Sequence, residues 1–301
     1  MEENNTKNKI EIRKILSIIF GSLFAACMIG IAIYVTKKIR DEKSIEAQVE
    51  EFNRIKQGAL DKTKEVASIG AYCLDMGMYE EADIEQEDEL ADQAIEIMPE
   101  YKELYDTNNY MIGWLTIDGT NVDYPVVQTP EDENMYLRKD FYGEDNDNGT
   151  LIMDTDSTVG IGRLENDYLG GEKPGSNLII HGHTMRSGAM FGKLNLYKNE
   201  EYEKEHSIIK FDSLYEKREY EVIAVFYSKV FYTYETDVFK YYKFFDATTQ
   251  EEFDDWYDNI KEMSLYDTGV EAEFGDEFIT LSCCSYHVPN GRFVVVGKRI
   301  K

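Results

Sequence analysis

The chain is poor in the residues that usually build cross-linked or reactive sites. Its 301 residues include only four cysteines, four histidines and five prolines. The cysteines are Cys27, Cys73 and the adjacent pair Cys283 and Cys284, which is no disulfide framework, and a bond within the adjacent pair would strain the backbone. Any site that needs a thiol or an imidazole must therefore be built from very few candidates.

Basic residues are also scarce. There are 32 Lys and Arg against 59 Asp and Glu, which gives a net charge of -27. Nucleic acid is not an expected partner, because phosphate binding needs clustered basic side chains. We interpret the acidity as a solvated surface that keeps the protein soluble. The alternative is that it attracts a basic substrate or keeps the protein away from anionic cell-surface polymers.

The sequence has one long hydrophobic run. Residues 15–35 form 21 uncharged positions, long enough to cross a bilayer as a helix. No small-residue cleavage site follows, which favours a retained anchor over a removed signal peptide. Four basic residues flank each side, so the positive-inside rule sets no orientation; they are Lys7, Lys9, Arg13 and Lys14, then Lys37, Lys38, Arg40 and Lys43.

Two regions follow the run. Residues 36–99 are acidic and carry Ile45, Val49, Phe52 and Ile55 at helical spacing, so we predict a helical stalk that could pack on the domain it carries. Together with a tail at residues 1–14 and the anchor, this leaves residues 100–301 as the main domain.

From about residue 100 the hydrophobic pattern changes to a period of two. Short apolar strands are predicted at residues 114–117, 124–127, 150–153, 177–180, 208–211, 220–227, 278–282 and 292–298. Many short strands separated by turns favour a closed barrel or a sandwich. One helix interrupts them at residues 248–263, with Thr248 or Thr249 as its N-cap, and with an apolar face of Phe253, Trp256, Tyr257 and Ile260.

The chemistry concentrates at strand ends. Cys283 and Cys284 close one predicted strand, Arg292 opens the next, and His183 follows the strand at 177–180. A nearby imidazolium or guanidinium favours the thiolate, which is the reactive form of cysteine. The combination predicts an acyl-transfer site built around a cysteine nucleophile.

Seven stretches, in this order, resemble the sortases, and specifically class B. They are Gly113 to Thr120, Asp123 to Gln128, Tyr136-Leu137, Gly149 to Ile152, Asn177 to His183, Met190 to Leu194, and Thr280 to Cys284 with Arg292 to Val295. The resemblance covers residues 100–301. It implies an eight-stranded β-barrel, and the inserted helix and the N-terminal helical segment indicate class B.

The resemblance assigns the catalytic residues with one departure. The usual Thr-Leu-x-Thr-Cys is here Thr280 to Cys284, so Cys283 replaces a threonine and Cys284 takes the nucleophile position. Successive strand residues point to opposite faces, so both thiols cannot serve one site. Cys284 would attack the substrate carbonyl, His183 would act as acid and base, and Arg292 would hold the carbonyl oxygen or the oxyanion.

A second departure concerns His181, where class B members commonly carry a tyrosine that lines the peptide groove. His181 and His183 would share a strand face, so geometry alone leaves His181 open as the base, whereas the family register selects His183. The resemblance implies that Leu137, His181 and Ser282 contact the substrate. His206 and His287 are expected to be loop histidines, and neither a metal ion nor a cofactor is expected.

The implied function is that of a membrane-anchored cysteine transpeptidase. It would cleave a C-terminal sorting motif of secreted proteins, of the Leu-Pro-x-Thr-Gly or Asn-Pro-x-Thr-Asn kind, after the Thr. A peptidoglycan-precursor amine or a pilin lysine would then release the thioacyl-enzyme. We expect a single-pass cell-membrane protein with a cytoplasmic N-terminus and an extracellular catalytic domain.

Two alternatives remain open. One is a pilus-polymerising sortase, although the Asp-Pro-aromatic lid tripeptide of class C is missing from the sequence. The other is a membrane-tethered β-barrel that binds a surface partner without chemistry. The anchor, stalk and barrel suit this second alternative equally well, whereas the Cys, His and Arg trio suits only an enzyme.

Overall fold

The structure is a computed structural model that describes the backbone of the chain apart from residues 1, 76–95, 162, 165–166 and 169–172. It divides into two compact units, Met1–Ser44 and Ile45–Lys301. The long helix α1 (Glu2–Asp75) contributes to both of them. Cys73 and most of the acidic run of the predicted stalk lie outside the residues whose side chains are described.

The first unit carries the predicted hydrophobic run. Residues 15–35 are helical throughout, and their large apolar side chains are exposed, as with Ile18 at 71% and Phe24 at 69%. By length and composition this helix could cross a membrane, and no other helix in the described part of the chain meets that test. The candidate span therefore falls where the sequence predicted it.

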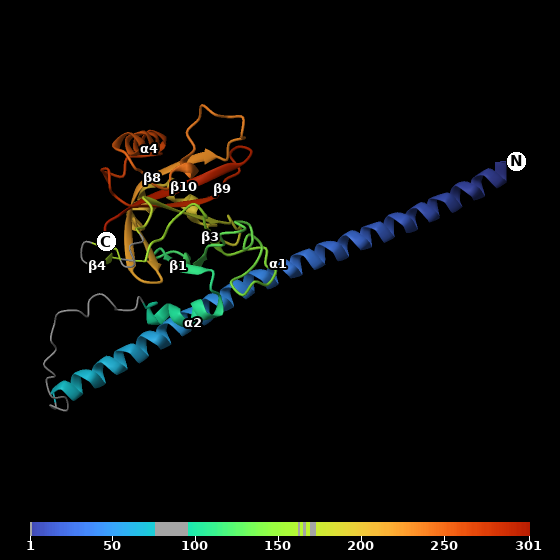
Figure 1. Cartoon of the computed structure of the whole chain (residues 1–301). Coiled ribbons are helices and arrows are strands. Elements are labelled where there is room, and N and C mark those ends of the chain that lie inside the picture. Colours follow the sequence, from blue (N-terminus) through green and yellow to red (C-terminus); the bar gives the residue numbers. More distant parts are fainter. Residues whose placement is uncertain (1, 76–95, 162, 165–166, 169–172) are drawn as a thin grey trace. The chain divides into compact units, whose positions relative to one another are not determined.

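The second unit is built on a closed eight-stranded barrel, which confirms the predicted fold (Figure 1). The strand order around the barrel is β1-β2-β3-β6-β9-β10-β8-β7. The strands are β1 (Met111–Thr116), β2 (Asp123–Val127), β3 (Leu151–Met153), β6 (Asn177–Gly182), β7 (Ile208–Ser213), β8 (Lys217–Lys229), β9 (Phe278–Cys284) and β10 (Gly291–Arg299). Each overlaps one of the eight predicted strands.

Several short elements were not predicted. Helix α2 (Pro99–Thr107) occupies the place where a period of two was expected to begin, and the first strand, predicted from residue 114, starts at Met111. Pro99 suits the first turn of a helix, where its missing N–H has no partner to lose. The others are β4 (Arg163–Leu164) and β5 (Asp167–Tyr168), which pair only with each other, and η3 (Leu194–Lys198), α3 (Glu200–Glu205) and η4 (Tyr241–Lys243).

Helix α1 packs on the barrel from Ile45 onward. Ile45 and Phe52 are buried at 5% and 2% exposure, on the apolar face that the helical spacing predicted. The Phe52 ring meets the Trp114 ring edge-on at 6.0 Å. The Lys56 ammonium lies 3.8 Å from the centre of the Trp114 ring, a cation–π contact. This part of the predicted stalk is therefore a structural layer of the barrel unit.

The predicted helix before the cysteine strand is α4 (Gln250–Met263). Thr249 is its N-cap, and Glu252 completes a reciprocal capping box with it. The apolar face buries Phe253 and Trp256 against β8, β9 and β10 in a second hydrophobic cluster outside the barrel interior. The inserted helix thus covers the strands that carry the cysteine and the arginine.

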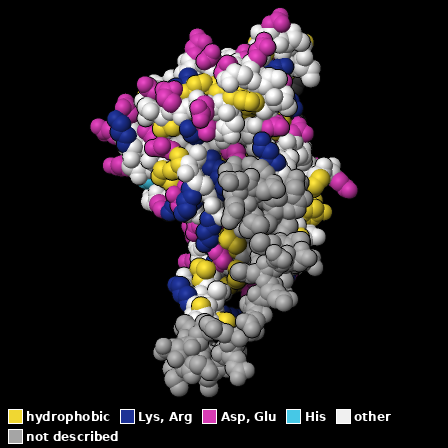
Figure 2. Space-filling view, turned by 60° about the vertical axis from the view of Figure 1, so that its left-hand side comes forward, with side chains coloured by type: hydrophobic (Ala, Val, Ile, Leu, Met, Phe, Trp, Pro, Cys, Tyr) yellow, Lys and Arg dark blue, Asp and Glu magenta, His cyan; other side chains and the backbone are white. Residues whose placement is uncertain are grey.

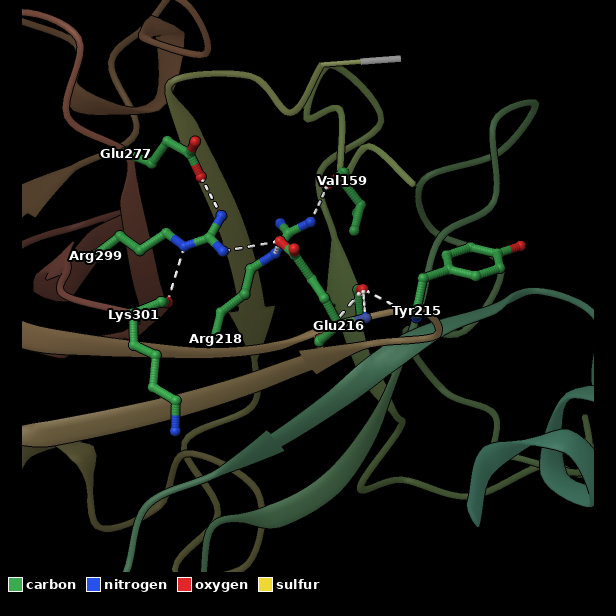
Figure 3. Close-up of polar contacts among 8 residues, drawn as sticks. Val159, Tyr215, Glu216, Arg218, Glu277, Arg299 and Lys301 are labelled. Carbon is green, nitrogen blue, oxygen red and sulfur yellow. Dashed lines mark hydrogen bonds and ion pairs between the residues drawn. The ribbon is translucent and has the colours of Figure 1, made fainter. Parts of the chain in front are cut away.

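One end of the β8, β9 and β10 sheet is closed by a network of buried charges (Figure 3). The Arg299 guanidinium donates to Glu277 at 2.6 Å and to Glu216 at 2.9 Å. Arg218, whose side chain is fully buried, donates to Glu216 and to the Val159 carbonyl, each at 2.6 Å.

On the face drawn in Figure 2, other acidic and basic side chains lie interspersed over the surface.

Candidate active site

Strand pairing brings the predicted catalytic residues into one row. Strand β6 runs parallel to β9 and its last pair is Gly182 with Cys283, so His183 and Cys284 are the residues that follow on the two chains. Strand β10 runs antiparallel to β9 with Arg292 opposite Cys284. Neighbouring strands lie about 5 Å apart, so the three residues meet at one end of three adjacent strands.

A pocket of about 250 Å³ opens at this end. It is lined by Glu133, Asn134, Leu137, Thr150, Ile152, Asp154, His181, Gly182, His183, Ser282, Cys283, Cys284 and Arg292. All three predicted catalytic residues and all three predicted substrate-binding residues are in this set. Their individual roles remain predictions.

The two thiols point to opposite faces of β9. Cys283 belongs to the barrel core with Ile279 and Leu281 and is 2% exposed. Burial raises the pKa of the Cys283 thiol to about 11, so it stays protonated at neutral pH. Cys284 is partly exposed, and both thiols are unbonded. Both residues are in the pocket lining, but Cys283 is the buried and Cys284 the partly exposed one, so Cys284 stays the predicted nucleophile.

His183 is held by the loop between β2 and β3, whose Leu137 lines the pocket. Its Nε2 lies 2.7 Å from the Leu137 carbonyl oxygen, and because a carbonyl only accepts, Nε2 carries the proton in this arrangement. Gly149 makes room for that carbonyl: its φ is +62°, and a Cβ there would lie 2.5 Å from the Leu137 oxygen. The next residue, Thr184, donates its hydroxyl to the Cys284 carbonyl at 2.6 Å, which joins the ends of β6 and β9.

His181 shares the outward face of β6 with His183, as predicted, but has different neighbours. Its Nε2 lies 3.2 Å from Asp154 Oδ2. Burial acts to raise the pKa of Asp154. The hydrogen bond from His181, together with other contacts, has the opposite and larger effect, so the pKa of Asp154 is lowered overall. His181 pairs with Ser282 across β6 and β9, so it stands two residues before the register position beside Cys284.

Arg292 keeps most of its donors open. Its Nη1 donates to the carbonyls of its own turn, Gly291 at 3.1 Å and Asn290 at 3.4 Å. Within the described part of the chain, no carboxylate lies within 4 Å of its guanidinium. A permanently charged group that is not neutralised, beside a thiol, is suited to hold a carbonyl oxygen or an oxyanion.

The remaining predicted contacts differ in accessibility. Leu137 is 41% exposed at the rim, whereas Ser282 is 1% exposed and its hydroxyl lies 2.7 Å from the Tyr241 hydroxyl. Tyr241 is buried beneath it, and burial raises the pKa of its hydroxyl well above the ordinary value. The other two histidines do not line this pocket: His206 stacks on Tyr202, and His287 contacts Tyr227.

Sequence reasoning missed part of the pocket wall. Asp154, the partner of His181, follows β3 directly, so a carboxylate at a strand end was a usable signal. Glu133 and Asn134 come from the loop between β2 and β3, whose course depends on contacts that no local pattern shows.

Comparison with known proteins agrees with this geometry. The Sortase domain family matches residues 115–300. Sortase B of Listeria monocytogenes is 31% identical over 208 residues, which cover 68% of this chain and 76% of the relative. The chain therefore belongs to the sortase family of cysteine transpeptidases, and within it to class B.

Solved structures show the same fold. A sortase B–substrate complex from Staphylococcus aureus superposes with a TM-score of 0.62 at 23% identity, covering 87% of this chain and 99% of that one. Sortase B from B. anthracis in complex with AAEK1 gives a TM-score of 0.54 at 30% identity, covering 68% of this chain and 86% of that one. The first likeness concerns the fold alone.

Proposed function

We propose that this sortase cleaves a C-terminal sorting motif of secreted proteins after its Thr and transfers the protein to a cell-wall amine. The observation that carries the proposal is the row of His183, Cys284 and Arg292 at the end of three adjacent strands, opening into one pocket. A thiol, an imidazole and an unneutralised guanidinium at this spacing are what acyl transfer requires.

In the first half-reaction the Cys284 thiolate attacks the Thr carbonyl, and the oxygen becomes an oxyanion beside Arg292. The C–N bond then breaks, and His183 gives a proton to the leaving amine. A thioester between Cys284 and the substrate remains. Arg292 contributes by binding charge that develops only in the transition state, which accelerates the step more than ground-state binding does.

In the second half-reaction an amine attacks the thioester. His183 takes the proton from the attacking nitrogen, an amide bond forms, and the Cys284 thiolate leaves. The buried thiol of Cys283 has no part in either step, because it faces the barrel core and stays protonated.

The candidate span suits a membrane anchor. We propose a cytoplasmic tail at residues 1–14, a transmembrane helix at 15–35 and an exterior barrel, because the proposed substrates exist only outside the membrane. Protease treatment of intact cells tests the orientation. Degradation of the barrel by external protease is expected, and a barrel protected until lysis would contradict the proposal.

The function itself is tested with the full chain in detergent and a panel of labelled sorting peptides. We expect cleavage at one bond, after Thr, with a mass-detectable acyl group on Cys284, and no cleavage by Cys284→Ala. An acyl group on Cys283, or cleavage that survives in Cys284→Ala, would refute the assignment.

A further inference from the structure

The active-site pocket carries unlike charges on its two sides. Arg292 enters from β10, whereas Glu133 and Asp154 enter from the loop before β3 and from the residue that follows β3. The strand order β3-β6-β9-β10 places Asp154 three strands from Arg292, about 14 Å along the sheet at the usual strand spacing. The site thus has a cationic side beside Cys284 and an anionic side away from it.

The two carboxylates differ in what they already bind. Asp154 accepts from His181 at 3.2 Å, so part of its charge is engaged. Glu133 Oε1 accepts from the Thr155 hydroxyl at 2.6 Å, and no Lys or Arg of the described chain lies within 4 Å of it. The Thr155 contact orients the Glu133 carboxylate and leaves Oε2 for a ligand.

We propose that Glu133 makes this enzyme selective for sorting peptides that carry a Lys or Arg within three residues of the cleaved bond. The inference rests on the proposed function. With the cleaved carbonyl at Cys284 on β9, strand β3 of the closed barrel lies two strands away, about 10 Å, and Glu133 lines the same pocket from the loop before β3. An extended peptide advances about 3.3 Å per residue, so a side chain two or three residues away from the cleaved bond reaches this side of the pocket.

The charge of the Glu133 carboxylate favours a cationic side chain in the substrate. A pocket wall that carries an unneutralised carboxylate repels an acidic side chain and attracts an ammonium or guanidinium group. Since Glu133 is exposed, water and salt weaken the attraction, so we expect a selectivity of about three- to tenfold at low salt. The overall charge of -27 also attracts cations, so the test must separate Glu133 from that general field.

The test compares three peptides that differ only in a Lys, Gln or Glu, placed in turn at each position within three residues of the cleaved bond. Hydrolysis is measured without an added acceptor, so that an acceptor amine cannot be the bound cation. We expect the wild type to cleave one Lys peptide about three- to tenfold faster in kcat/KM than its Gln match, mostly through KM. Glu133→Gln should bring that ratio close to one.

Glu131→Gln is the matched control. Glu131 is exposed on the same loop as Glu133 but does not line the pocket. Its substitution by Gln removes the same single negative charge. Glu131→Gln should keep the wild-type ratio of kcat/KM between the Lys and the Gln peptide. Thr155→Val frees the Glu133 carboxylate to rotate, so it should reduce this ratio without abolishing it. Charge reversal in Glu133→Lys should turn the preference toward the Glu peptide.

Several outcomes would overturn the inference. They are equal cleavage of the three peptides at every position, a preference that survives Glu133→Gln, and an equal loss in Glu131→Gln. If peptides are cleaved at Thr in each case, the proposed function stands while the inference fails. Binding of the same peptides to Cys284→Ala, measured by fluorescence anisotropy, must show the same order of affinities, and a different order would also overturn it.

Discussion

Strand β10 carries an arginine near each end, and the two have opposite surroundings. Arg299 donates to Glu277 at 2.6 Å, to Glu216 at 2.9 Å and to the Lys301 carbonyl at 2.8 Å, and its side chain is 11% exposed. Among the residues that the structure describes, Arg292 donates only to carbonyls of its own turn, and it borders the pocket beside Cys284. One strand therefore presents an ion-paired, buried arginine at one end and an arginine without a carboxylate partner among the described residues at the other.

The difference separates a structural charge from one available for chemistry. A buried guanidinium needs carboxylate partners, because desolvation of an unpaired charge is costly. Burial acts to lower the pKa of Arg299, yet the Glu277 contact and other interactions raise it overall, so the guanidinium stays charged. At the other end the donors are left for a ligand, as an oxyanion site requires.

Apart from the loss of the nucleophile itself, the largest effect is expected from removing the imidazole of His183, beside Arg292 in the pocket. His183→Ala should lower kcat/KM for peptide cleavage by about 10²- to 10⁴-fold, because proton transfer to the leaving amine is lost. His181→Tyr, the matched change on the same strand face, should keep activity and alter mainly KM or motif preference. Steady-state kinetics with one sorting peptide checks both, and an active His183→Ala beside an inactive His181→Ala would reverse the assignment.

The comparison between the two arginines is sharpened by Arg292→Ala. Loss of the donor to the oxyanion should lower kcat by about 10²- to 10³-fold, with little change in melting temperature, since no ion pair is broken. Arg292→Lys should recover only part of the activity, because an ammonium lacks the planar fork. An Arg292→Ala enzyme with nearly normal kcat would show that Arg292 is merely a surface charge.

At Arg299, the ion-paired end of β10, substitution is expected to lower the stability of the folded barrel unit and not its activity. Arg299→Ala removes ion pairs to Glu277 and Glu216 and should destabilise the barrel unit by about 3 kcal/mol, a fall in melting temperature of about 10 °C. The folded fraction should keep wild-type kcat. Differential scanning fluorimetry with a parallel activity assay checks this, and an unchanged melting temperature would refute the structural role.

The individual strands could be predicted because their signals are local, whereas the closed eight-stranded barrel was implied by the resemblance to the sortases, since the pattern alone left a barrel or a sandwich open. Alternating apolar residues predicted the eight strands, and the sequence predicted a helix capped by Thr248 or Thr249, of which the structure shows Thr249 with Glu252. Cys284, His183 and Arg292 could be named because each stands at a strand end inside a family motif, and strand register then brings them together.

The rest depends on long-range contacts. The loop that carries Glu133 and Leu137 is positioned by hydrogen bonds such as Thr150 N to the Tyr136 carbonyl, and by the space at Gly149. No periodicity encodes such contacts. Helix α2 was missed for a similar reason, because nine residues are too few for a clear helical pattern, and only Pro99 marked its start.

The smallest effect is expected from the second thiol, through Cys283→Thr, which restores the residue common in the family. Because Cys283 faces the core, activity should stay within about tenfold of wild type, roughly 1.4 kcal/mol of barrier. The pH dependence of stability should change instead. The pKa of this thiol is about 11 in the folded chain against an ordinary value of 9.0. Between these values the unfolded thiol ionises while the folded one stays protonated, so the wild type loses stability as pH rises.

Urea unfolding from pH 8 to 11 measures this as a difference between Cys283→Thr and wild type, which cancels the titration of other groups. The stability of the variant relative to wild type should rise across the window from about pH 9 to 11, because the variant has no thiol to ionise. A constant difference would mean that Cys283 is not held in the protonated state by the core. A loss of activity much greater than tenfold would mean that the second thiol takes part in the reaction, and the separation of the two faces of β9 would then fail as an explanation.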